Sequence, residues 1–308
     1  MKTLLPCLAL TFMAGAIIIY PERYISCCYT GFALWAQCVL PSLFPFMVIT
    51  LILIKTGFAE KAALPLKRVT GIFNLPPAAA VCFIISMFSG YPAGAKALTE
   101  FYESGCFSQS DCKKLSLFCS TSGPLFILGS VGVKMLGQRQ AGWKILAAHL
   151  IAVLAVGLML SFIFKKGESR TFKRAPVDKN VLYNSFYGAV ISVAVAGGFI
   201  AFFCVAAQIL TDFNILLPIE KFLCLFTDAD SASAVSRGLI EITAGCKGLA
   251  EADGNLTLPF AGFLITFGGV SIIMQQLSYL LKAKVNPLLF VGVKLLQGVV
   301  CFLILLLI

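Results

Sequence analysis

One polar, glycine-rich string interrupts an otherwise apolar part of the sequence. It runs from Ser89 to Lys96 and reads Ser-Gly-Tyr-Pro-Ala-Gly-Ala-Lys. Glycine permits sharp reversals and proline removes a backbone donor, so the string predicts a break between two helices. A helix that restarts near Gly94 would point free N–H groups at the break, where they attract anions. Lys96 would add a full positive charge there, unless it only extends toward the membrane surface.

A carboxylate lies in a comparable apolar stretch of the second half. Glu241 belongs to the string Leu-Ile-Glu-Ile-Thr-Ala-Gly, which ends at Gly245. An ionisable group inside a membrane is a functional candidate by default. We expect Glu241 to bind a coupling proton or cation, or to pair with Lys247 or Lys96. An exposed glutamate at the membrane surface is the alternative.

Two further runs place polar residues and glycines where helices are expected. Residues 120–124 read Ser-Thr-Ser-Gly-Pro, and their hydroxyls and freed carbonyls are suited to coordinate an ion or a substrate. In the second half, the glutamines after Gly268 either bind substrate or join helices by hydrogen bonds. The predicted substrate-binding residues are Ser89, Gly90, Tyr91, Gly94, Lys96, Ser122, Gly123, Glu241, Thr243, Gly245, Lys247, Thr266, Gly268 and Gln275.

No motif of a known catalytic chemistry accompanies these residues. The chain has one histidine, His149, and lacks the HExxH, GxSxG and Walker A patterns. Its 12 cysteines lie mostly in apolar runs and have neither zinc nor redox spacing. We therefore expect no metal, no cofactor and no enzymatic activity.

The elements that position these residues must lie in a membrane. Of the 308 residues, 59% are hydrophobic and 12% are charged, whereas a typical soluble domain has about 25% charged residues. A soluble core in a chain of this size cannot bury so much apolar surface. The net charge of +10 arises from basic residues between apolar runs, which excludes a nucleic-acid partner.

The sequence therefore predicts an all-α polytopic membrane protein, because several apolar runs approach the roughly 20 residues that a spanning helix needs. Two stretches around the glycine-lysine strings, 71–95 and 231–250, are expected to form re-entrant or broken helical hairpins. The seven predicted spans are 4–20, 31–54, 115–133, 145–164, 181–211, 254–281 and 285–308.

The two halves of the sequence also resemble each other. The string Gly94-Ala-Lys96 matches Gly245-Cys-Lys247, and Thr-Ser-Gly at 121–123 matches Thr-Phe-Gly at 266–268. If the hairpins are re-entrant, each repeat crosses the membrane three times and the second repeat is inverted. This topology places 15 basic residues on the cytoplasmic side and 7 on the other, as the positive-inside rule requires.

Inverted repeats with broken helices are the architecture of many secondary transporters. The expected organisation has four parts. They are an N-terminal helix and loop at 1–30, a first repeat at 31–164, a basic cytoplasmic loop at 165–180 and an inverted second repeat at 181–308.

Four strings together resemble one known family. They are Pro-Ser-Leu-Phe-Pro-Phe at 41–46, the string at 89–96, Ser-Gly-Pro-Leu-Phe at 122–126 and the string at 239–245. They look like sporulation integral membrane proteins of the YlbJ (SpoVV) type, which carry a Gate or nucleoside-recognition domain and are distantly similar to concentrative nucleoside transporters. The resemblance implies a role in endospore formation, with transport of dipicolinic acid across the outer forespore membrane.

The charge of the substrate that the resemblance implies is consistent with the residues. Dipicolinate is a small aromatic dianion, and helix N-termini and Lys96 would attract an anion. The expected partners are a small anionic solute, the lipid bilayer and a coupling proton or cation; a homo-oligomer is compatible with the sequence. A Gate-type transporter of nucleosides or another small solute is one alternative, and a membrane scaffold that transports nothing is another. An intramembrane enzyme is disfavoured because no nucleophile–base pair is visible.

Overall fold

The computed structural model is helical, and the part of the chain that it describes contains no strand. It describes residues 4–56, 58, 61, 64–73, 75–103, 105–163, 180–252 and 254–308, so the basic loop expected at 165–180 lies almost wholly outside it. Within this part, five helices are long and apolar enough to cross a membrane. They are Pro21–Leu53, Arg139–Ser161, Val181–Asp212, Thr257–Leu280 and Pro287–Leu307.

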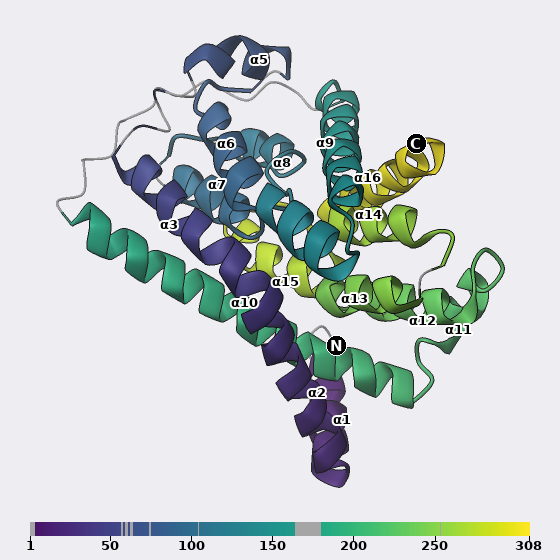
Figure 1. The fold of residues 1–308 in the computed structure, drawn as a ribbon. Coiled ribbons are helices and arrows are strands. Elements are labelled where there is room, and N and C mark those ends of the chain that lie inside the picture. Colours follow the sequence, from purple (N-terminus) through teal and green to yellow (C-terminus); the bar gives the residue numbers. More distant parts are fainter. Residues whose placement is uncertain are drawn as a thin grey trace.

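Two pairs of long helices frame the molecule. The first pair is α3 (Leu40–Lys55) against α10 (Val181–Asp212), and the second is α9 (Arg139–Ser161) against α16 (Pro287–Leu307). Shorter, interrupted helices lie between the two pairs (Figure 1). The remaining helices are α1 (Leu4–Ile19), α2 (Pro21–Leu34), η1 (Trp35–Val39), η2 (Leu64–Leu66), α5 (Lys67–Ile72) and α11 (Leu217–Leu223).

The first half contains two interruptions. Helix α6 (Ala79–Ser89) stops at Gly90, whose φ of 69° suits glycine, and α7 (Ala93–Glu103) starts three residues later. After α8 (Gln109–Leu115) the chain forms a turn and then a non-helical segment at 120–123. A π-helix, η3 (Phe126–Met135), follows this segment.

The second half contains interruptions in the same order. Helices α12 (Ala229–Gly238) and α13 (Ile242–Ala252) form a hairpin that is broken at 239–241. Helix α14 (Thr257–Phe267) then ends at Gly268, which has a φ of 93°, and α15 (Gly269–Leu280) continues from there. Each half thus holds a long helix, a broken hairpin, a second break and another long helix.

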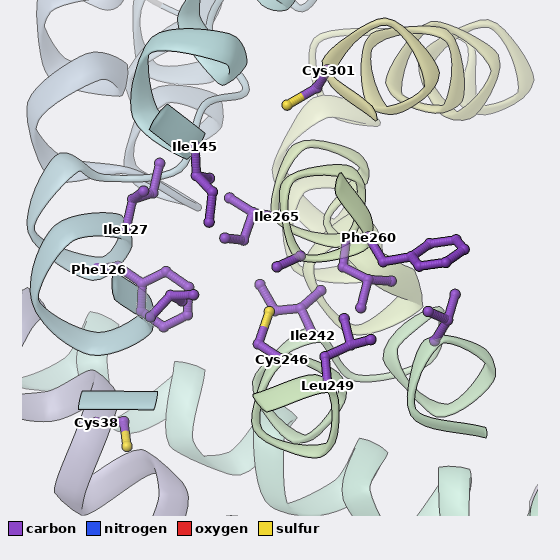
Figure 2. Close-up of a cluster of buried hydrophobic side chains, with 14 of the residues drawn as sticks. Cys38, Phe126, Ile127, Ile145, Ile242, Cys246, Leu249, Phe260, Ile265 and Cys301 are labelled. Carbon is purple, nitrogen blue, oxygen red and sulfur yellow. The ribbon is translucent and has the colours of Figure 1, made fainter. Parts of the chain in front are cut away.

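The apolar core joins the elements that carry the breaks. Phe126 and Ile127 of η3 belong to the same buried cluster as Ile242 and Cys246 of α13 and Ile265 of α14. Figure 2 shows part of this cluster, which lies between the two halves of the chain. Burial of apolar side chains has no directional preference and so does not fix how the helix ends are oriented. The hydrogen bonds of the polar groups at the breaks must fix that orientation.

Several of the expected spans differ from the structure: the described residues hold five candidate spans where seven were expected, α1 has only 16 residues, and the run 254–281 is interrupted at Gly268. The run 115–133 is not one helix: α8 ends at Leu115, the chain is non-helical at 120–123, and it becomes helical again at Pro124, a residue type favoured at the start of a helix. The span expected from residue 31 begins at Pro21, a residue type that is favoured at the first helical position. Its helix therefore crosses the boundary expected between residues 30 and 31. The all-helical membrane class is confirmed, and the inverted topology stays a prediction.

We predict that residue 169 and the exposed Cys224, which follows α11, lie on opposite sides of the membrane. Ser169→Cys and native Cys224 would each serve as the single thiol of a protein with no other cysteine. Labelling by a membrane-impermeant maleimide, with and without permeabilisation, gives the side of each. Reaction of both thiols from the same side contradicts the inverted arrangement.

Candidate functional site

A small cavity of about 40 Å³ lies between the helix breaks of the first half and helices α10, α13 and α15 of the second half. Five of the residues predicted from sequence line it: Tyr91, Ser122, Gly123, Thr243 and Gln275. Its other walls are apolar. They are formed by Val39, Leu43, Phe126, Ala196, Ile200, Ile242 and Ile272.

The two breaks of the first half touch each other through glycine. A Cβ atom on Gly90 would lie 2.5 Å from the backbone nitrogen of Gly123, so no larger residue fits at this approach. Ser89 and Gly90 are buried at the end of α6. Tyr91, the next residue, forms part of the cavity wall. The contact brings the hairpin tip and the non-helical segment at 120–123 to one wall of the cavity.

The two breaks of the second half are joined by backbone hydrogen bonds. The N–H of Val270 donates to the carbonyl of Leu239 at 2.8 Å, and the N–H of Ser271 donates to that of Ile240 at 3.0 Å. These bonds satisfy donors in the first turn of α15, just after Gly268. The start of α15 is therefore fixed against the tip of the second hairpin.

Side chains from the long helices satisfy the non-helical backbone at 120–122. The N–H of Ser122 donates to Nε2 of His149 on α9 at 3.1 Å, and Nζ of Lys294 on α16 donates to the carbonyl of Ser120 at 2.9 Å. Thr121 exchanges hydrogen bonds with Ser86 of α6. Because no water solvates the hydrocarbon core, such partners are what permits an irregular segment at this depth.

Tyr91 connects the cavity to the buried Lys294. Its ring lines the cavity, and its hydroxyl accepts a hydrogen bond from Nζ of Lys294 at 3.0 Å. The same hydroxyl donates to the carbonyl of Ile265 on α14 at 3.2 Å. Thr266, the next residue, shares a 2.9 Å hydrogen bond with Nδ1 of His149 and does not line the cavity.

Gln275 has a polar group available for a ligand. It lines the cavity, is 2% exposed, and its Nε2 has no hydrogen-bond partner within the protein. A buried donor without a partner costs about 1–3 kcal/mol. Ser122 and Thr243 line the same cavity, so three polar residues belong to its otherwise apolar wall.

Glu241 is fully buried at the break between α12 and α13, which excludes the alternative of an exposed glutamate. Its Oε2 accepts the N–H of Ala244 at 2.8 Å, and so caps the first turn of α13. Its Oε1 has no hydrogen-bond partner within the protein. Glu241 does not itself line the cavity, although its neighbours Ile242 and Thr243 do.

The two lysines predicted to bind an anion lie outside the cavity. Gly94 packs against Ser86 of the other hairpin arm, and Gly245 packs against Gly238 in the same way. Each lysine follows its glycine by two residues, which is about 200° around a helix. Lys96 is accordingly half-buried away from the cavity.

Lys247 is exposed and pairs with Glu251 at 3.7 Å, and not with Glu241 as the sequence had suggested. The structure instead places Lys294 against Tyr91 of the cavity wall. Sequence reasoning missed Lys294, although it is the only charged residue in the apolar run of α16 and such a residue is a functional signal. Among the described residues, no three His, Cys, Asp or Glu side chains gather as a metal site.

Comparison with known proteins gives one clear similarity. No family model matches the chain, and no solved structure matches it. The chain is 27% identical to the sporulation integral membrane protein YlbJ of Bacillus subtilis (strain 168), in an alignment that covers 97% of this chain and 80% of that protein. The apolar spans and this similarity over nearly the whole length agree. This similarity over nearly the whole chain supports an assignment to the YlbJ type of sporulation integral membrane protein.

Proposed function

We propose that this protein is a membrane transporter of a small anionic metabolite and that the cavity at the helix breaks is its substrate site. The observation that carries the proposal is that both breaks of the first half, at Tyr91 and Ser122, line one cavity together with α13 and α15, the helices that follow the breaks of the second half. Irregular backbone at membrane depth is tolerated only where protein or a cavity surrounds it. Secondary transporters build their substrate sites from such discontinuous helices.

The proposal includes an inverted repeat. Its support is the equivalent position of features in the two halves, since Gly94 and Gly245 each make the close contact between the arms of a hairpin. The next break follows at Gly123 in the first half and at Gly268 in the second. Across the halves, α7 packs on α15 and α13 packs on η3. Alternating access in such folds moves one bundle against another around a fixed site.

Dipicolinate is the proposed substrate, because the family resemblance supplies it and the residue types that line the cavity suit it. Tyr91 and Phe126 offer aromatic faces to a planar ring, and Gln275 offers a free N–H donor to a carboxylate. Nucleosides are the second candidate, since they too combine a planar ring with polar groups.

The cellular setting is proposed from the relative alone. That relative is a sporulation integral membrane protein, and we place this chain in the outer forespore membrane on the family resemblance. Neither the resemblance nor the cavity calls for enzymatic chemistry. A scaffold that transports nothing is the competing function, and it requires no solute in the cavity.

We predict that purified protein in liposomes takes up labelled dipicolinate and that Ala196→Phe reduces this uptake about tenfold or more. Ala196 lines the cavity from α10, so a phenyl ring there would occupy substrate space. Ala194→Phe is the matched control, because Ala194 is exposed on the same helix and faces away from the cavity. Nucleosides added in excess test the alternative substrate.

Uptake, membrane level and thermal stability should be measured together for both variants. Equal uptake by Ala196→Phe and wild type would show that the cavity is not on the transport route. Absence of uptake by wild type, with dipicolinate or nucleosides, would favour the scaffold.

We also predict that Glu241→Gln slows uptake several-fold with little change in membrane level. Glutamine retains an oxygen that can accept from the N–H of Ala244, but it removes the charge that a coupling cation or proton requires. Glu251→Gln serves as the control, since Glu251 is exposed. Normal uptake by Glu241→Gln between about pH 6 and pH 8 would remove Glu241 from the coupling cycle.

A further inference from the structure

Lys294 is an ionisable side chain in the interior of the helix bundle. It lies in the middle of α16 and is 1% exposed. Its Nζ donates to the hydroxyl of Tyr91 at 3.0 Å and to the carbonyl of Ser120 at 2.9 Å, and it stands 5.1 Å from the centre of the Tyr91 ring. Both acceptors are uncharged.

The elements around Lys294 provide no negative charge to balance an ammonium group. Helix α9 presents His149, whose Nε2 accepts from the N–H of Ser122. This leaves Nδ1 as the donor to Thr266 and makes the ring neutral. The other titratable groups that face Lys294 are Tyr91 and the thiol of Cys301 on α16 itself. In the described part of the chain, no carboxylate pairs with it.

An uncompensated ammonium group in this position costs several kcal/mol in lost solvation. An anion in the cavity would offset that cost, because Tyr91 both lines the cavity and contacts Lys294. Charge interactions are strong in a medium of low dielectric constant. Binding of an anion and protonation of Lys294 must then favour each other to the same extent.

We propose that the two events are linked, so that a carboxylate solute enters the cavity together with one proton, which Lys294 carries. The amine of Lys294 takes the proton from solution on the side where the anion binds and returns it on the side where the anion leaves. This inference rests on the proposed function and adds the mode of coupling. It leaves Glu241 as the candidate group for a coupling cation.

Purified wild-type protein tests this link by calorimetric titration with dipicolinate in buffers of different ionisation enthalpy. The carboxylates of the ligand stay ionised between about pH 6 and pH 9, so any proton taken up belongs to the protein. We expect proton uptake on binding, approaching one per anion at the alkaline end. Affinity should fall with rising pH, at most by about tenfold per pH unit for one linked proton.

Lys294→Gln keeps an N–H donor for the carbonyl of Ser120 and removes the charge. It should bind dipicolinate more weakly, with an affinity that no longer depends on pH. Lys282→Gln, at an exposed position after α15, should behave as wild type. Lys294→Gln that keeps the wild-type pH dependence would assign the proton to another group and overturn the inference.

The wild-type titration remains decisive if Lys294→Gln fails to fold. Binding of dipicolinate to wild type without proton uptake overturns the inference and leaves the proposed function intact. Absence of dipicolinate binding to wild type contradicts the proposed substrate and the inference together.

Discussion

A backbone that leaves the helix inside a bilayer must find partners for every N–H and C=O that it frees, and this requirement governs the whole structure. The segment at 120–123 meets it with side chains from other helices: His149 binds the N–H of Ser122 and Lys294 binds the carbonyl of Ser120. One such group left alone in hydrocarbon costs several kcal/mol. The long helices α9 and α16 therefore do more than span the membrane, because they hold the break in place.

The cavity follows from the same requirement. Breaks that satisfy one another must lie close together, as Gly90 and Gly123 do in the first half and as Leu239 and Val270 do in the second. Side chains at the breaks of the first half and on the helices that follow the breaks of the second half then line one cavity, although they come from segments far apart in the sequence. A continuous helix would bury its polar backbone completely and present no such site.

The sequence predicted the breaks because glycine and proline mark them locally. Five of the fourteen predicted residues line the cavity, and the pairing of the two halves as an inverted repeat stays a prediction. Sequence reasoning failed where the outcome depends on rotation about a helix, as for Lys96, or on contacts between distant segments, as for Lys294 and Tyr91. The close contacts of Gly94 and Gly245 determine how each helix is rotated about its own axis. The local pattern of charged residues does not reveal these contacts.

The central claim is that a solute occupies the cavity where the breaks meet. Thr243→Cys, in a protein with no other cysteine, places one thiol on the cavity wall, and its rate of modification by a small methanethiosulfonate reagent can be measured directly. The account predicts that dipicolinate slows this modification in a saturable manner, while a cysteine at the exposed position 194 is unaffected. A rate at Thr243→Cys that saturating dipicolinate and nucleosides both leave unchanged would contradict it.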